Sequence, residues 1–400
     1  MDPNMALDLV KQGATLLLLD VPQYTLIGID TQMFSSGPNF NGVKMIPPGV
    51  HFVYYSSSDK GGSQFSAIVG FFIDASPSQV IVRKWEQKEE RFVKLSEEEE
   101  GRYSDAVRRL EFDKKLGPYT LSQYGAWKNL SNYITKDTIE RIEPIGGEIT
   151  IACEPDMVGR SSKTIMEEKM SEQLTNNRFA TSEEKSKRRG CYYTTIPRVV
   201  KYKGMSGQEL TNLNVDKTQL LESILMKEYG GDENALLAEL QFAFIAFLMG
   251  QSLEAFLQWK LLLTLLFGCT EAPLRTRSRL FTKFVRIVFY QLKYGFKKDE
   301  NDIGAMREGV PALLDESWLS SDSFLHHLCK EFFSVVLEAP VVDGDLLSWT
   351  RKLKSLVEDT LGWAFRPKSS STGDGIYFDE DDEYAPVVEF TNDTDEYMVG

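Results

Sequence analysis

The apolar pattern of this amino-acid sequence changes its period part-way along the chain. Residues 14–95 carry short apolar runs separated by turn residues, whereas residues from 206 onward place apolar side chains at helical spacing. Short strands at such intervals are typical of an antiparallel sandwich or barrel. The helical spacing of the second part is typical of a helix bundle or a short solenoid. We therefore predict an α+β chain, with an antiparallel β-sandwich-like N-terminal domain and an all-α C-terminal domain. The predicted strands are 14–19, 43–46, 51–56, 68–73, 80–85 and 91–95.

Helices are predicted beside the strands and throughout the second half of the chain. Residues 97–115 and 121–134 have amphipathic spacing, and we expect them to close the N-terminal domain. Asp216, Asp232 and Ser252 precede apolar segments as candidate N-caps, and the short connection before Ser252 predicts an antiparallel helical hairpin. The remaining predicted helices run from Pro273 to about 294, over 319–338 and over 346–361.

The length of the chain, 400 residues, suits two ordinary domains of about 100 to 200 residues each. Residues between the two patterned parts have no sustained apolar period, which predicts a polar linker. Their basic cluster 185–189 could be a nuclear-import signal, but such short patches often arise by chance, so we interpret it as part of the solvated linker. The predicted division is a β-rich domain over 1–152, a polar linker over 153–204, an α-helical domain over 205–366 and an acidic tail over 367–400.

The negative charge of the chain is concentrated at its C-terminal end. Residues 369–400 hold ten acidic side chains and no Lys or Arg, so of the net charge of −14 only −4 belongs to the rest. Binding to a phosphate backbone needs a concentrated basic face, and direct RNA binding is therefore not expected. The acidity suits a protein partner instead.

Neither disulfides nor membrane segments are predicted. The four cysteines, Cys153, Cys191, Cys269 and Cys329, are far apart and form no C-x-x-C pair, so we expect reduced thiols in an intracellular protein. The start of the chain shows no signal-peptide pattern, and the apolar stretches 236–249 and 253–267 are short and interrupted by polar residues. We expect no membrane span.

No catalytic, cofactor or metal site is predicted, so we expect the protein not to be an enzyme. His326 and His327 are adjacent and cannot both face one metal from a helix, and no glycine pattern resembles a phosphate-binding loop. Asp20, Asp30 and Asp74 lie at strand ends, where turn formation is the simpler explanation for an aspartate.

His51, one of three histidines, follows the segment Ile-Pro-Pro-Gly-Val. Pro48 and Gly49 suit the central positions of a type II turn, which predicts a tight reversal between two strands. In the second strand His51 would share a face with Val53 and Tyr55. With no nucleophile motif to partner it, His51 is predicted to have a structural or surface role, and His51→Gln is expected to be tolerated.

The acidic tail contains one strand-like island over 384–390. Its apolar residues alternate with a period of two, and such an extended segment can add to the exposed sheet edge of a partner. A tail that only keeps the protein soluble explains the composition equally well. The candidate partner-binding residues are Tyr384, Ala385, Pro386, Val387, Val388, Glu389 and Phe390.

Several stretches together resemble the AAR-two splicing-factor family, in the same order and over nearly the full length. Residues 37–52 read Gly-Pro-x-Phe-x-Gly-Val-Lys-Met-Ile-Pro-Pro-Gly-Val-His-Phe, which is the most specific of them. The others are Tyr55-Ser56-Ser57, Leu116-Gly117-Pro118-Tyr119 with Trp127, Leu130 and Asn132, the run Glu239 to Phe244, Glu254-Ala255-Phe256 with Trp259-Lys260, and Ala385 to Glu389.

The resemblance implies a non-enzymatic assembly factor of the U5 small nuclear ribonucleoprotein (snRNP), with a helical domain of the VHS type. It implies binding to the RNase H-like and JAB/MPN-like domains of the large U5 scaffold protein, and competition with the U5 RNA helicase. The tail strand, here 384–390, would join the two scaffold domains, with release favoured by phosphorylation and with both cytoplasmic and nuclear localisation. A generic helical adaptor of the trafficking type is the alternative, and it should not need the tail.

Overall fold

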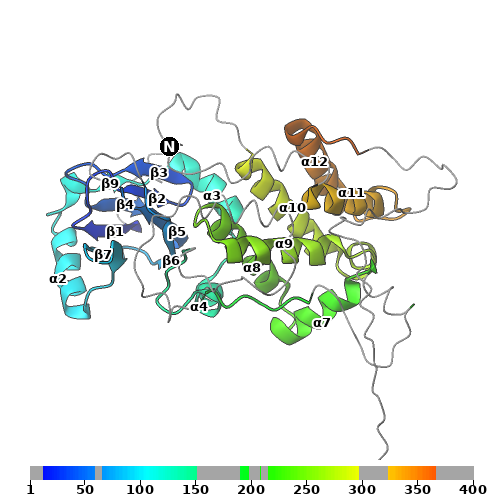
Figure 1. The fold of residues 1–400 in the computed structure, drawn as a ribbon, viewed down its shortest axis with the longest axis horizontal. Helices are drawn as coiled ribbons and strands as arrows, with labels where there is room; N and C mark the ends of the chain where they lie inside the picture. The colour runs from blue at the N-terminus through cyan, green and yellow to red at the C-terminus, as the bar shows by residue number, and fades with distance from the viewer. Residues whose placement is uncertain are drawn as a thin grey trace, which may run out of the picture.

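The structure is a computed structural model, in which two β-sheets form one part of the molecule and a set of helices the other (Figure 1). The predicted α+β architecture is therefore confirmed. The residues that the structure describes are 12–58, 65–150, 190–197, 208, 215–296 and 323–365.

The N-terminal part contains a five-stranded and a four-stranded sheet. The strand order is β8-β7-β1-β4-β9 in the first sheet and β3-β2-β5-β6 in the second. The six predicted strands are confirmed, and β2, β3 and β9 were not predicted. The strands are β1 (Ala14–Leu19), β2 (Leu26–Ile29), β3 (Gln32–Ser35), β4 (Gly42–Ile46), β5 (Gly49–Ser56), β6 (Val69–Ala75), β7 (Val80–Glu86), β8 (Arg91–Val93) and β9 (Gly117–Pro118).

The prediction of a wholly antiparallel domain is wrong for the first sheet. The second sheet is antiparallel throughout, but in the first sheet β1 pairs with β7, and β4 with β9, in parallel. The chain visits the second sheet twice between β1 and β7, and it then re-enters the first sheet in the direction of β1. Apolar runs carry no information on strand direction, so the mixed pairing depends on this path between the sheets.

The diproline segment is a corner between the sheets, and the predicted tight reversal is wrong. β4 ends at Ile46 and β5 begins at Gly49, but the two strands belong to different sheets and do not pair. Gly49 has a positive φ, at 129°. Proline removes backbone donors where the chain leaves a ladder, so Pro47 and Pro48 suit a crossing from one sheet to the other.

The two faces of β5 serve two cores. Val53 and Tyr55 are buried in the core between the sheets, as the alternation predicted, whereas Phe52 and Tyr54 join a core that extends into the helices. Phe72 of β6 stacks on Phe242 of the helical part at a ring-centroid distance of 4.5 Å. The second sheet is therefore covered by the first sheet on one face and by helices on the other.

The helices follow the predicted pattern with two changes. Asp232 and Ser252 cap α8 and α9 with their side chains, as predicted, and α8 packs against α9. Pro273 lies in a short π-helical turn, so the next helix begins only at Ser278, and α11 begins at Phe324. The helices are α2 (Glu97–Arg108), α3 (Tyr124–Ser131), α4 (Lys136–Ile142), α7 (Thr218–Glu228), α8 (Glu233–Leu248), α9 (Leu253–Phe267), α10 (Ser278–Gly295), α11 (Phe324–Leu337) and α12 (Gly344–Leu361).

The two parts of the molecule share one hydrophobic core. Helix α3 was predicted only to close the N-terminal part, and α4 was not predicted, but α3 contacts α8 and α10, and α4 contacts α8 (Figure 1). Trp127 and Ile139 from these helices belong to the same apolar cluster as Leu240 and Trp259. The helices therefore join the two parts.

Residues 190–197 differ from the predicted polar linker. Thr194 and Ile196 are buried, and the backbone of Tyr192 donates a hydrogen bond to the carbonyl of Ile142 at the end of α4. The backbone N–H of Cys191 donates to Glu254 of α9 at 3.0 Å. This segment lies between α4 and the helical hairpin. Its backbone N–H groups there donate hydrogen bonds to protein groups in place of water.

Candidate functional site

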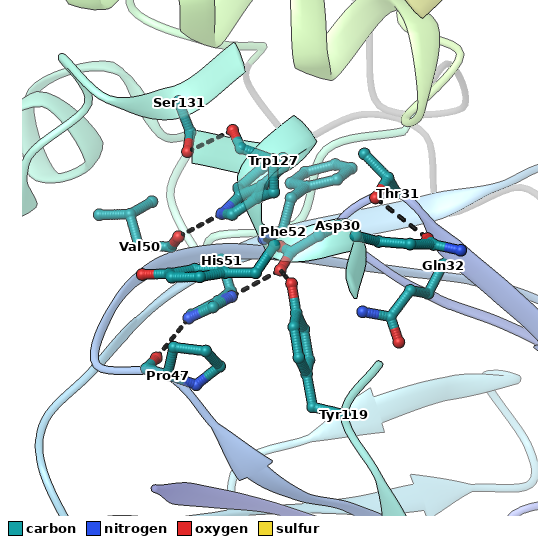
Figure 2. Close-up of polar contacts among 12 residues, drawn as sticks. Asp30, Thr31, Gln32, Pro47, Val50, His51, Phe52, Tyr119, Trp127 and Ser131 are labelled. Atoms are coloured by element: carbon teal, nitrogen blue, oxygen red, sulfur yellow. Dashed lines mark hydrogen bonds and ion pairs between the residues drawn. The ribbon is translucent and has the colours of Figure 1, made fainter. Parts of the chain in front are cut away.

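His51, the residue that most resembled a catalytic group in the sequence, lies in a closed polar cluster. Its Nδ1 is 2.6 Å from Oδ2 of Asp30, and its Nε2 is 2.6 Å from the carbonyl oxygen of Pro47 (Figure 2). The hydroxyl of Tyr119 donates to the same Asp30 oxygen at 2.6 Å, and the N–H of Phe52 donates to the other at 3.0 Å. We call Asp30, Pro47, His51, Phe52 and Tyr119 the His51 cluster.

The charge state of the His51 cluster follows from its acceptors. Both ring nitrogens of His51 face oxygen acceptors, and only the imidazolium form can donate from both. Burial by itself lowers the pKa of His51, but the charge and hydrogen bond of Asp30, with the Pro47 carbonyl, outweigh it, and the net pKa is raised. His51 and Asp30 therefore form a buried ion pair.

The His51 cluster is structural. The side chains of His51 and Asp30 are 0% exposed, and the indole of Trp127 stacks near the imidazole at a centroid distance of 6.4 Å. The indole N–H donates to the carbonyl of Val50 at 2.8 Å, which holds α3 over β5 (Figure 2). The cluster joins the β2–β3 turn, the proline corner and the residue after β9, so it connects both sheets. The structural role predicted for His51 is confirmed, and the surface alternative is wrong.

The expectation that His51→Gln is tolerated must be revised. Glutamine can donate one bond to Asp30 but carries no charge, so we expect a loss of about 1–3 kcal/mol in the free energy of unfolding. Because the pKa of His51 is raised on folding, protonated His51 stabilises the folded state. This stabilisation is complete below the ordinary imidazole pKa of 6.5 and is lost as the pH rises through the folded-state pKa. Urea unfolding across pH 5 to 9 should show the deficit of the variant shrinking as pH rises.

The matched control for His51 is His327→Gln, since the side chain of His327 is exposed on α11. We expect this exposed substitution to leave the free energy of unfolding nearly unchanged. A His51→Gln deficit that is the same at every pH would contradict the charged pair.

A second buried cluster joins the N-terminal part to the helices. Glu239 of α8 is 0% exposed and accepts five donors, which come from four other places in the chain. Thr194 donates through its N–H at 2.8 Å and its hydroxyl at 2.9 Å, and Arg141 of α4 lies at 2.9 Å. Tyr229 and Gln258 complete the set at 3.0 and 2.9 Å. We call these five residues the Glu239 cluster.

Further polar contacts come from α8, at the same junction, and from α9, within the helical part. Gln241 donates to the side-chain oxygen of Asn132 at 2.8 Å and accepts from the N–H of Tyr133 at 2.8 Å. The indole of Trp259 donates to Gln291 of α10 at 3.0 Å. Many of the residues on which the family resemblance depends therefore meet at the junction.

The Glu239 cluster was not predicted, although the sequence carries a signal for it. Glu239 and Gln241 interrupt a long apolar stretch, which argues against a membrane span, and both belong to the run Glu239 to Phe244 of the family resemblance, but no buried polar site was predicted from them. Polar residues within an otherwise buried helix must find internal partners. Asp30 was likewise interpreted only as a turn residue; its φ of 55° confirms the turn, but its carboxylate also holds His51.

The remaining predictions concern metal ligands, membrane spans, cysteines and the two candidate segments 185–189 and 384–390. In the described part of the chain, no three His, Cys, Asp or Glu side chains come together as metal ligands would, and no helix there has the length and apolarity of a membrane span. Burial raises the pKa of the thiols of Cys269 and Cys329. The candidate strand 384–390 and the basic cluster 185–189 lie outside the described residues.

The fold and its junction define a class of protein in which a domain of two sheets is fused to a helical domain through a shared core and buried polar clusters. Two family models match the chain in this order, the AAR2 N-terminal domain over residues 12–144 and the AAR2 C-terminal repeat region over 193–366. The chain belongs to the AAR2 family, which is the AAR-two family that the sequence resembled.

Curated relatives agree with this assignment. The chain is 31% identical to Protein AAR2 homolog of Homo sapiens over 379 residues, covering 91% of this chain and 93% of the relative. It is 30% identical to the Caenorhabditis elegans protein of the same name over 378 residues, covering 91% and 98%. A protein of Saccharomyces cerevisiae named A1 cistron-splicing factor AAR2 is 21% identical over 286 residues, covering 70% and 76%.

Proposed function

We propose that this protein is a non-catalytic assembly factor of the U5 snRNP in pre-mRNA splicing. Membership of the AAR2 family carries the proposal, since two family models together cover both parts of the fold and a yeast relative is named as a splicing factor. The structural use of His51 agrees with a binding role, because the residue that most resembled a catalytic base is occupied in holding the sheets together.

The proposed partner is the large U5 scaffold protein, through its RNase H-like and JAB/MPN-like domains. The acidic tail would contribute the strand 384–390 to the edge of a partner sheet, and this docking would keep the U5 RNA helicase away until release. Phosphate added beside the acids of the tail would weaken docking by repulsion. Such a factor would act in the cytoplasm and the nucleus.

Binding can be tested with a recombinant two-domain piece of the scaffold protein. We expect the full-length chain to capture it, and a chain ending at Lys368 to bind about tenfold more weakly or less, since about 1.4 kcal/mol of strand contacts would be lost. Calorimetry gives both affinities. The absence of binding by the full-length chain would reject the partner, whereas equal binding by both chains would reject only the role of the tail.

A helical adaptor of the trafficking type remains the second candidate. It would bind peptides through the helices and would be indifferent to the tail. The same calorimetric measurement separates the two candidates, because only the assembly factor is expected to bind the scaffold domains.

A further inference from the structure

The groove between α3 and α10 is lined by cations. It is a pocket of about 200 Å³, and no carboxylate contributes to its lining. Lys128, Lys283 and Arg286 provide its positive charge, and Asn132, Tyr133 and Tyr290 provide amide and hydroxyl groups. A pocket of this composition is suited to anionic groups.

The cations of this pocket are not neutralised within the described part of the chain. Arg277, just before α10, pairs with Glu222 at 2.7 Å and with Glu233 at 2.9 Å. In contrast, no described carboxylate lies within ion-pair distance of Lys128, Lys283 or Arg286. The net charge of the chain is −14, so carboxylates are abundant elsewhere. The lack of acids here is therefore a local property of the surface.

Aromatic rings support these cations and extend the positive surface onto α12. Lys128 lies over Tyr124 at 5.8 Å and Lys283 over Tyr133 at 5.9 Å. Trp349 of α12 lies under both Arg286, at 5.5 Å, and Lys352, at 4.4 Å. Cation–π contacts hold a side chain in place while they leave its charge available. We call Lys128, Lys283, Arg286 and Lys352 the basic face, and Figure 1 shows α10 between the two other helices that carry it.

We propose that the acidic run Asp379–Glu383 of the same chain docks on the basic face. Its five consecutive carboxylates are the densest negative charge in the sequence, and residues 369–400 contain no Lys or Arg that would compete for them. Charge complementarity and covalent attachment together favour the chain's own tail as the occupant.

The tether is long enough for this docking. The acidic run begins fourteen residues after Phe365, where the description of the chain ends, and an extended chain of that length spans up to about 50 Å. The tail has to run back along α12 from its end at Leu361 to Trp349, which lies at the basic face. This distance along the helix is only about 18 Å. A tether of this kind gives an effective concentration on the order of millimolar, so exposed ion pairs that are individually weak suffice.

Docking would regulate the strand that follows. Residues 384–390 come directly after the acidic run, so a docked run holds them against the protein and away from a partner's sheet. This consequence rests on the proposed function, whereas the docking itself does not.

The docking can be tested on the full-length chain without any partner. A zero-length carbodiimide reagent joins a carboxylate to a lysine only where the two are in contact, and mass spectrometry identifies the pairs. At low salt we expect cross-links from Lys128 and Lys283 to residues 379–383, reduced at least about fivefold by 0.5 M salt because exposed charges are screened. Absence of these cross-links would overturn the proposal.

The decisive variant is Arg286→Glu, which keeps both reporter lysines. We expect it to lower the cross-link yield about fivefold, while Arg102→Glu, an equal charge change on exposed α2, leaves the yield unchanged. Equal yields in the two variants would overturn the docking. Cross-links between isotopically distinct copies, in a mixture of labelled and unlabelled chains, would overturn it in favour of a dimer contact.

A binding measurement tests the regulatory consequence. We expect Arg286→Glu to increase capture of the two-domain scaffold piece about threefold at low salt relative to Arg102→Glu. Unchanged capture despite lost cross-links would reject the regulation but leave the docking in place. If the full-length protein captures no scaffold piece, the proposed function fails, and the cross-linking result stands on its own.

Discussion

Asp30→Ala is expected to lower the free energy of unfolding by about 3–5 kcal/mol, the cost of removing one partner of a buried ion pair. The substitution leaves His51, Tyr119 and the N–H of Phe52 without their shared acceptor in a site closed to water. Urea denaturation monitored by tryptophan fluorescence measures the loss, and Trp127, which stacks near His51, is one of the reporting side chains.

Asp20→Ala is the matched control for Asp30. Both aspartates follow a strand with a positive φ, 58° for Asp20 and 55° for Asp30, so alanine introduces the same backbone strain, about 1 kcal/mol, at each. The side chain of Asp20, however, is 70% exposed. The difference between the two variants therefore isolates the buried contacts. Similar losses for both would show that the turn conformation, and not the His51 cluster, explains Asp30.

Glu239→Gln is expected to cost a similar amount, about 3–5 kcal/mol, at the junction of the two parts. An amide NH₂ would replace one carboxylate oxygen and point a donor at other donors, and the charge that faces Arg141 would be lost. Because the N–H and the hydroxyl of Thr194 both donate to Glu239, residues 190–197 should also become accessible. Hydrogen exchange should show faster exchange of the Thr194 amide, alongside a lower denaturation midpoint.

Glu140→Gln is the control for the junction. Glu140 lies on α4 next to Arg141, but its side chain is 60% exposed and pairs with Lys136 one turn away. We expect a change of a few tenths of a kcal/mol and no effect on the exchange of Thr194. Protection of Thr194 that survives Glu239→Gln would contradict the role of the Glu239 cluster.

Much of the architecture could be predicted because local patterns determine it. Short apolar runs with turn residues between them predicted six strands, and Asp232 and Ser252 predicted the starts of α8 and α9. The alternation along β5 also predicted correctly that Val53 and Tyr55 share one face. Capping and side-chain alternation depend on neighbours within a few residues, so a single sequence is enough to recognise them.

The errors concern relations between distant segments. The parallel pairing of β1 with β7 depends on how often the chain crosses between the sheets, which no local pattern records. The same holds for the proline corner, whose residues predicted a bend correctly but not that the two flanking strands lie in different sheets. Strand partners were therefore beyond the reach of the sequence.

By itself, the sequence determined the two kinds of architecture, the helix starts, the acidity of the tail and the resemblance to the AAR2 family, since each is written in composition or local order. The roles of the buried polar residues depend on contacts between distant parts of the chain. Asp30 and His51 are separated by 21 positions, and Thr194 and Glu239 by 45, and each pair meets in a core from which water is excluded. Burial turns a turn aspartate and an apparent catalytic histidine into structural contacts, because in low dielectric a polar group must find a partner within the fold.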